Sequence, residues 1–176
     1  GGLKEYWDLV RKYPSYQGGF IWDFVDQALR WPSAAEGTDH VFVYGGDFND
    51  YDPSDNSFCC NGIIAADRTY HPHAYEVAYQ YRSILTSSDS PLSGVVDVYN
   101  ENFFINLSRY MMEWDVEVDG AKVLAGVVSS LDIAPQQTSR VNLGFNEADV
   151  LEASGAEDLA SHDVYLNVRS VLKRAD

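Results

Sequence analysis

The chain has 176 residues, of which 45% are hydrophobic and 22% are charged, a composition that supports a packed core and excludes a disordered chain. Its formal net charge of −15 would repel the phosphates of a nucleic acid and the surface of an anionic membrane, so we expect neither as a partner. No apolar run approaches the roughly 20 residues of a membrane span, which predicts a soluble protein, cytoplasmic or periplasmic, without deciding between these compartments.

The first predicted element is an amphipathic helix over residues 2 to 13, GLKEYWDLVRKY. Pro14 follows at a position where a helix must already have ended. The apolar residues at helical spacing are Leu3, Tyr6, Trp7 and Val10. Because the sequence starts on a double glycine without methionine, we interpret it as a piece of a longer protein.

Residues 18 to 27, GGFIWDFVDQ, are apolar on both faces of a predicted strand, as in a parallel strand that is covered on each side. A helix followed by such a strand is the repeating unit of an α/β barrel or of a doubly wound sheet. We therefore expect residues 18 to 27 to form a buried strand.

Three residues of this stretch, Trp22, Asp23 and Asp26, are candidates for a binding site. Trp22 either fills space in a core or offers its aromatic face to the apolar side of a sugar ring. The two carboxylates favour the second interpretation, since a carboxylate is rarely buried unless it is paired or hydrogen-bonded. We expect both carboxylates to have partners or to bind substrate.

Residues 28 to 66 read as a long irregular excursion rich in turn-forming residues. Its carboxylates suggest a calcium site, but the stretch DFNDYDPSD lacks the central glycine and terminal glutamate of an EF-hand loop, and solvated loop charge is the favoured interpretation. These carboxylates are Asp47, Asp50, Asp52 and Asp55. Cys59 and Cys60 are adjacent, which is unsuited to an ordinary disulfide and predicts two free thiols.

A second helix is expected in residues 67 to 82, starting after His71-Pro72. His71 and His73 could be metal ligands, but no nearby cysteine and no Glu-x-x-His pattern completes a site. Packing and helix-entry roles are therefore favoured for both histidines.

Beyond Thr86 the pattern is that of short alternating strands separated by turns, which indicates a β-sandwich. Asp119-Gly120 predicts a hairpin turn, and Trp114, Val116 and Val118 share a face opposite Asp115 and Glu117. We place a domain boundary between residues 85 and 86, which gives an α+β chain with domains 1–85 and 86–176.

Five ordered stretches together resemble the large β-galactosidases of glycoside hydrolase family 2. They are LKEYWDLVRKYPSYQGGFIWDFVDQ, YGGDFND, FCCNGIIAADRTYHPHAYEV, VYNENFF and LDIAPQQ. The resemblance implies that residues 1–85 are the C-terminal helix-strand-helix part of a (β/α)8 TIM barrel, whose active site lies at the C-terminal ends of the strands. It also implies that residues 86–176 form an immunoglobulin-like antiparallel β-sandwich.

The same resemblance assigns roles to four residues. Trp22, with Asp23 beside it, would bind a β-galactoside such as lactose, and a monovalent cation, usually sodium, would lie beside the sugar. Its ligands would be the backbone oxygen of Phe58 and the side-chain oxygen of Asn61, although the ring of Phe58 could simply pack. Magnesium is allowed in the parent protein, with ligands outside this chain.

Retaining glycosidases need two carboxyl groups about 5 to 5.5 Å apart. In the family both groups are glutamates that precede the double glycine. None of Glu5, Glu36 and Glu76 lies in either glutamate motif. We therefore expect no catalytic residue in the chain and no activity of the chain alone. The parent would hydrolyse terminal β-D-galactosides with retention.

The alternative to an enzyme fragment is a carbohydrate-binding or subunit-interaction sandwich without catalysis. A spacer role is favoured over lectin-like binding, because Phe103, Phe104, Tyr110 and Trp114 mostly alternate as core residues do. Partners would include the rest of the parent chain and a second copy, since exposed faces of Phe20 and Trp22 predict self-association or a rearranged, partly disordered N-terminal half.

Overall fold

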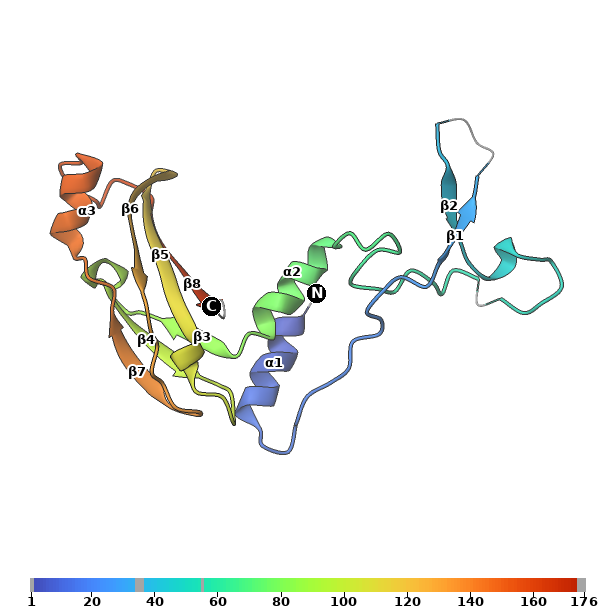
Figure 1. Ribbon diagram of the computed structural model, residues 1–176, viewed down its shortest axis with the longest axis horizontal. Helices are drawn as coiled ribbons and strands as arrows, with labels where there is room; N and C mark the ends of the chain where they lie inside the picture. Colours follow the sequence, from blue (N-terminus) through green and yellow to red (C-terminus); the bar gives the residue numbers. More distant parts are fainter. Residues whose placement is uncertain (1, 34–36, 55, 174–176) are drawn as a thin grey trace. The chain divides into compact units, whose positions relative to one another are not determined.

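The computed structural model describes residues 2–33, 37–54 and 56–173 of the chain (Figure 1). The chain divides into two units, Gly1–Arg82 and Ser83–Asp176. The expected boundary between residues 85 and 86 falls inside strand β3 (Ile84–Ser87) and, as a division between two domains of a parent protein, stays a prediction. Helices occur together with antiparallel sheets, in agreement with a mixed α and β chain. None of the helices in these residue ranges has the length and apolar character that crossing a membrane requires.

Two helices of the first unit, α1 (Leu3–Lys12) and α2 (Pro72–Gln80), lie side by side (Figure 1). The ring of Trp7 stacks on that of Tyr81 with centroids 4.3 Å apart, and Arg11 donates to the carbonyl of Gln80 at 3.2 Å. Pro72 occupies the first position of α2, where an amide hydrogen would have no partner within the helix. Proline is therefore favourable at this position. Both predicted helices are confirmed, including the entry at His71-Pro72.

The predicted buried strand over residues 18 to 27 was wrong. Only Val25 forms a bridge, a parallel one with Ile64, and Phe20 and Phe24 are exposed. A strand requires partners for its backbone groups, and within the described residues the only segment paired with this stretch is 61–64. The stretch is therefore extended but forms no continuous ladder.

Residues 28 to 66 contain more regular structure than the sequence suggested. Strands β1 (Leu29–Pro32) and β2 (His40–Val43) form an antiparallel hairpin, with Leu29 opposite Val43. A short 3-10 helix, η1 (Gly45–Asp47), follows, and Asp47 accepts a hydrogen bond from the backbone of Tyr44. The turn-rich composition of the flanking residues concealed the hairpin.

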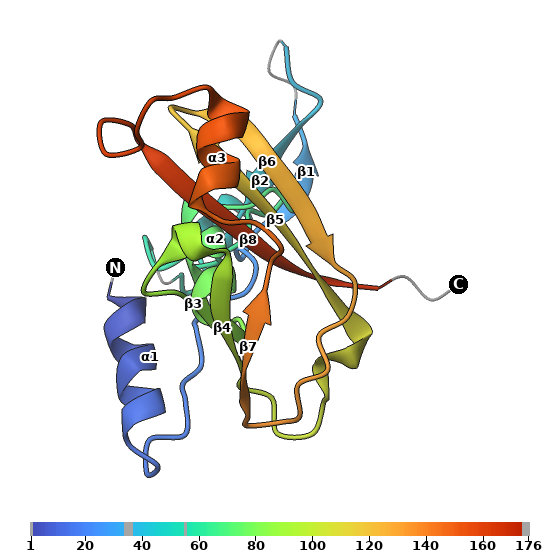
Figure 2. The same ribbon diagram turned by 90° about the vertical axis from the view of Figure 1, so that its left-hand side faces the viewer.

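The second unit contains two three-stranded antiparallel sheets (Figure 2). One has the order β3-β4-β7, with β4 (Val95–Asn100) in the centre and β7 (Thr138–Asn142) at its edge. The other has the order β6-β5-β8, with β5 (Tyr110–Val118) between β6 (Ala121–Val128) and β8 (Val164–Leu172). Short 3-10 helices, η2 (Pro91–Ser93) and η3 (Leu107–Arg109), precede β4 and β5. The short alternating strands expected beyond Thr86 are confirmed.

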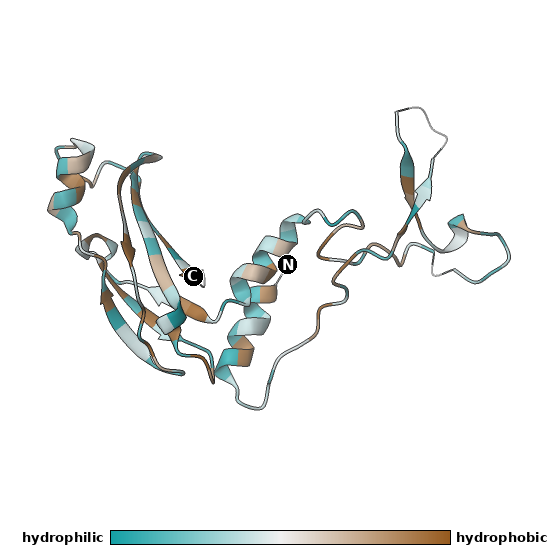
Figure 3. Cartoon of the chain, in the orientation of Figure 1, coloured by the Kyte–Doolittle hydropathy of each residue, from teal (hydrophilic) through white to brown (hydrophobic). Residues whose placement is uncertain are grey.

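The buried apolar side chains of the described residues all belong to this second unit. They come from both sheets and from the connections between them, so one core joins the two sheets. Figure 3 shows hydrophobic positions interspersed with hydrophilic ones along these strands. The core residues are Val96, Val98, Leu107, Met112, Trp114, Val116, Val118, Leu131, Ile133, Leu143, Phe145, Val150 and Leu159.

The turn from β5 to β6 has positive φ at both central residues, 50° at Asp119 and 78° at Gly120, as the sequence predicted for a two-residue hairpin. Trp114, Val116 and Val118 are buried together, also as predicted. Asp115 differs from the expected wet face, because it is only 7% exposed. Asn167 and Lys122 both donate to its carboxylate, at 2.9 Å each, and cover it.

Two features of the second unit depart from the sequence-based expectation. Helix α3 (Glu147–Ser154) lies between β7 and β8 and was not predicted. Phe103 and Phe104 were expected to alternate as core residues and are instead 70% and 95% exposed. They follow the end of β4 in a connection to η3, where strand alternation no longer decides which side chain is buried.

Candidate functional site

The candidate site is built from two segments of the first unit, residues 22–27 and 58–64. They pair through their backbones: the Asp23 amide donates to Asn61 O at 2.8 Å, and the Ile63 amide donates to Asp23 O at 3.0 Å. Further along, the Ile64 amide donates to Phe24 O at 3.0 Å, and the Asp26 amide donates to Ile64 O at 2.9 Å. The pairing brings together residues almost 40 positions apart in the sequence.

Gly62 makes this close approach possible. A Cβ atom at residue 62 would lie 2.2 Å from Asp26 N and 2.4 Å from Val25 C, both backbone atoms of the opposite segment. Such distances are far inside van der Waals contact, so a side chain at this position would force the two segments apart. Glycine is required here by space rather than by an unusual dihedral angle.

Asp26 is the buried anchor of the two segments, with 9% of its surface exposed. One carboxylate oxygen accepts from the Gly62 amide at 2.8 Å, and the other lies 2.8 Å from His71 Nε2. His73 stacks on His71 with ring centroids 5.4 Å apart, and its Nε2 lies 3.1 Å from Gly62 O. The expectation that Asp26 has partners is confirmed, and the histidines pack at the entry of α2.

Asp23 also has partners. Its Oδ1 accepts from the Phe24 amide at 2.6 Å, and its Oδ2 accepts from Gln27 Nε2 at 2.8 Å. The other end of the Gln27 amide, Oε1, lies 3.2 Å from Asn61 N and 3.5 Å from Asn61 Nδ2. A carboxylate oxygen has more than one lone pair, so a substrate role for Asp23 stays a prediction.

Trp22 is 72% exposed and lies at the start of the first segment, joined to Asp23 by a cis peptide bond. Within the described residues, Trp22 is therefore not packed in a core. The exposed indole has the accessibility that stacking on a sugar requires, and the next residue, Asp23, pairs with Asn61 through its backbone. Its role as a substrate residue stays a prediction.

The two predicted cation ligands lie three residues apart in the second segment. The backbone oxygen of Phe58 lies 3.3 Å from the hydroxyl of Tyr44, and the ring of Phe58 is exposed and does not fill a core. The side-chain oxygen of Asn61 has no hydrogen-bond partner within the described part of the chain. Backbone and amide carbonyl oxygens are ligands that hard cations take, so the donors present fit such an ion.

Within the described residues, the other candidate ligands are not grouped into a metal site. Asp47, Asp50 and Asp52 are exposed, which confirms solvated loop charge for these three, whereas Asp55 lies outside the described residues. Cys59 and Cys60 are free thiols. Among residues 2–33, 37–54 and 56–173, no group of three histidine, cysteine or acidic side chains is arranged to hold a metal.

Glutamates were predicted to carry no catalytic role. Glu5 is exposed on α1, and Glu76 accepts from Gln80 on the same helix at 2.8 Å. Glu36 lies outside the residues that the structure describes. The absence of a catalytic carboxylate from the chain stays a prediction.

Sequence reasoning missed two partners in the site. Gln27 was not predicted as a partner of Asn61, and His71 was not predicted as a partner of Asp26. Their contacts span 34 and 45 positions, respectively. The spacing of nearby residues in the sequence does not predict such contacts. Only the pairing of the two segments brings them together.

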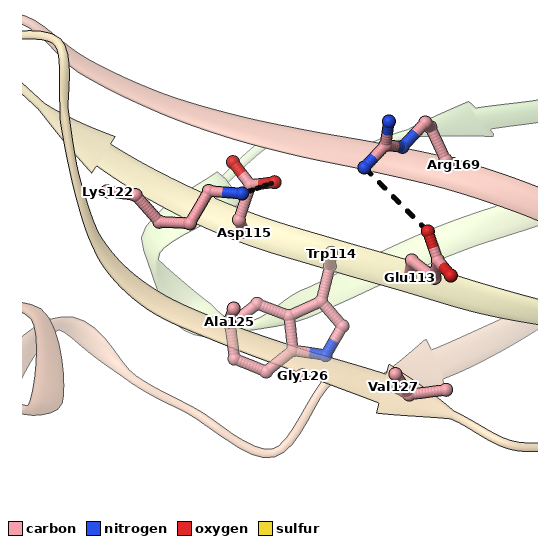
Figure 4. A pocket seen from close by; sticks show the side chains of 8 residues that line it. All are labelled: Glu113, Trp114, Asp115, Lys122, Ala125, Gly126, Val127 and Arg169. Atoms are coloured by element: carbon pink, nitrogen blue, oxygen red, sulfur yellow. Dashed lines mark ion pairs between the residues drawn. The ribbon is translucent and has the colours of Figure 1, made fainter.

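The second unit has a separate depression of about 320 Å³ on the sheet β6-β5-β8 (Figure 4). Lys122 pairs with Asp115 at 2.9 Å, and Arg169 pairs with Glu113 at 3.7 Å. The charges therefore balance, and the depression offers no excess charge to a ligand. Trp114 contributes a buried Nε1 that has no hydrogen-bond partner among the described residues.

Comparison with known families gives matches for both units. Residues 1–86 match the family described as "Glycosyl hydrolases family 2, TIM barrel domain". Residues 96–176 match the family described as "Beta-galactosidase, domain 4". The two matches follow one another in the order that the sequence motifs indicated.

The chain is also similar to curated β-galactosidases. It is 41% identical over 145 residues to that of Priestia megaterium, a match that covers 82% of this chain and 14% of the relative. It is 37% identical over 177 residues to that of Enterobacter cloacae, covering 99% and 16%, and 40% identical over 161 residues to that of Clostridium acetobutylicum, covering 88% and 17%. The chain therefore spans about a sixth of the length of these relatives.

Proposed function

Because the chain belongs to glycoside hydrolase family 2, we propose that it is a part of a β-galactosidase that hydrolyses terminal non-reducing β-D-galactosides with retention of configuration. The first unit would be the end of a (β/α)8 barrel, and the second an immunoglobulin-like sandwich. Phe20 and Trp22 are exposed, and no apolar side chain is buried among the described residues of the first unit. Both observations support a piece of a barrel whose packing partners belong to other parts of the parent protein.

One observation carries this proposal: the accessible Trp22 directly precedes Asp23, whose amide bonds to Asn61 O, and the side-chain oxygen of Asn61 has no partner among the described residues. An indole can pack on the apolar face of galactose, while Asn61 and the backbone oxygen of Phe58 would hold a monovalent cation, for which we propose sodium. When bound, the cation supplies a positive charge to which a sugar hydroxyl oxygen can coordinate. Trp22 and Asp23 would orient the sugar.

Catalysis would come from two glutamates outside this chain, one as nucleophile and one as acid/base. The residues of the chain then bind and orient the sugar but form no covalent intermediate. We accordingly propose that the chain alone does not hydrolyse a β-galactoside. Turnover of a chromogenic β-galactoside by the purified chain, abolished by a substitution within it, would contradict this division of roles.

The binding role is tested in the full-length protein by Trp22→Ala. Loss of about 80 Å² of apolar contact with the sugar, at about 25 cal/mol per Å², corresponds to about 2 kcal/mol or about a 30-fold lower kcat/KM. Trp31→Ala is the matched control, because Trp31 is also exposed but packs edge-on against Phe48 at 5.6 Å in the hairpin region. Equal effects of the two substitutions would refute a sugar platform at Trp22.

A second candidate role, subunit interaction, is favoured by one observation in the second unit. Phe103 and Phe104 are exposed neighbours with ring centroids 6.3 Å apart. Adjacent exposed aromatic rings are typical of an interaction surface. Replacing both by serine should lower the association state measured by light scattering, and an unchanged molar mass would leave the sandwich with a spacer role.

A further inference from the structure

Gln27 lies between a carboxylate and the predicted cation ligand. Its Nε2 donates to Asp23 Oδ2 at 2.8 Å, and its Oε1 faces both nitrogens of Asn61, at 3.2 Å from the backbone amide and 3.5 Å from Nδ2. Gln27 is partly buried. No other side chain in the described ranges makes hydrogen bonds to both Asp23 and Asn61.

The carboxylate of Asp23 determines the order of donors and acceptors along the contacts from Asp23 through Gln27 to Asn61. An ionised carboxylate can only accept, so Asp23 requires the NH₂ end of the Gln27 amide. The oxygen end of Gln27 then faces Asn61 and accepts from its backbone amide and from its side-chain Nδ2. Asp23 is itself held by the Phe24 amide at 2.6 Å, so the starting point does not rotate freely.

The consequence concerns the remaining end of Asn61. With Nδ2 directed at Gln27, Oδ1 is the end of the amide left without a protein partner in the described part of the chain. Had the Asn61 amide been turned by half a rotation, the ligand oxygen would face Gln27 Oε1, and two acceptors would meet. The carboxylate of Asp23 therefore selects, through Gln27, which atom Asn61 presents.

We propose that Gln27 is a positioning residue that orients the side-chain oxygen of Asn61 for a monovalent cation, with Asp23 as its anchor. This inference rests on the proposed function, since it presumes the cation. A purely structural role would be to hold the two segments together. Four backbone hydrogen bonds between residues 23–26 and 61–64, together with Asp26, already do so without Gln27.

The test is Gln27→Met in the full-length protein, because methionine keeps the length of the side chain and removes the amide. Sodium binding is measured by the line width of the sodium NMR signal and, separately, by the sodium dependence of kcat/KM. Loss of a residue that orients a metal ligand typically weakens binding by about 10-fold to 100-fold. We expect a loss in this range, recovered activity at saturating sodium, and an unchanged melting temperature.

Gln17→Met is the matched control, since Gln17 is exposed in the same stretch of chain. Asp23→Asn is a second variant, which keeps the shape of the side chain but can donate to Gln27 and so no longer selects one orientation. It should weaken sodium binding by itself and have little further effect when combined with Gln27→Met. Coupling of this kind distinguishes a shared orienting role from two independent structural losses.

The outcomes separate this inference from the function on which it rests. Sodium binding that is absent in the parent protein, or unaffected by Asn61→Ala, would overturn the cation site and the inference together. Sodium binding that is lost in Asn61→Ala but unchanged in both Gln27→Met and Asp23→Asn would overturn the inference alone. If Gln27→Met lowers the melting temperature, additive effects in the double variant would likewise refute an orienting role.

Discussion

Gly62→Ala is the substitution whose effect the structure specifies most sharply. The added Cβ would lie 2.2 Å from Asp26 N, 2.4 Å from Val25 C and 2.7 Å from Ile64 O. Ordinary contact begins at 3.4 Å, so the nearest atom must move by about 1.2 Å. All three atoms are backbone, and no side-chain rotation relieves the clash.

The expected loss of free energy follows from the hydrogen bonds that this movement breaks. Hydrogen bonds at 2.8 and 2.9 Å join Gly62 N to Asp26 Oδ1 and Asp26 N to Ile64 O, and both fail after a shift of this size. Overpacking typically costs about 1 to 3 kcal/mol, and each lost hydrogen bond adds about 1 kcal/mol. With two hydrogen bonds lost, we expect the pairing of the two segments to lose about 3 to 5 kcal/mol.

Amide hydrogen exchange measures this loss locally. A change of about 3 kcal/mol corresponds to a more than 100-fold faster exchange of the protected amides of Asp23, Asp26 and Ile64. Gly19→Ala is the control, because a Cβ at residue 19 meets nothing within 4 Å. If Gly62→Ala leaves exchange at these amides as slow as Gly19→Ala does, the close approach does not determine the site.

Two further predictions concern the second unit. Val116 is fully buried, so Val116→Ala should lower the free energy of unfolding measured by urea denaturation by about 2 kcal/mol. Val127 on the adjacent strand is 59% exposed, so Val127→Ala should change this free energy by less than about 0.5 kcal/mol. Equal effects of the two substitutions would contradict the assigned core. The hydrogen bond to Asp119 raises the pKa of His162 above 6.5, and the same bond lowers the pKa of Asp119 below 3.8. The stabilisation by this pair is therefore lost as pH rises through the raised histidine pKa and as pH falls through the lowered aspartate pKa. Asp119→Asn should return the NMR-measured pKa of His162 toward 6.5, and an unmoved titration would refute the pairing.

Local patterns in the sequence were sufficient for much of the fold. Helical spacing ended by Pro14 and started by Pro72 located α1 and α2, and Asp119-Gly120 located the β5–β6 turn. Helix α3 was missed although its signals are present, a capping box of Asn146 with Asp149 and a left-handed Gly155 at the end. Beyond Thr86 we predicted only strands separated by turns, so these helix signals were not used.

Contacts between distant residues could not be predicted. The stretch 18–27 has the composition of a buried strand, but burial depends on neighbours that the described chain provides only at 61–64. The pairing of Asp26 with His71 and of Gln27 with Asn61 likewise depends on that approach. Phe103 and Phe104 show the same limit, because composition alone does not reveal that the strand has already ended.

The most direct measurement is a structure of the full-length protein with a β-galactoside and sodium bound. We predict that the indole of Trp22 packs on the sugar ring and that Oδ1 of Asn61 contacts the cation. A sugar bound at a site that touches neither residue would contradict it.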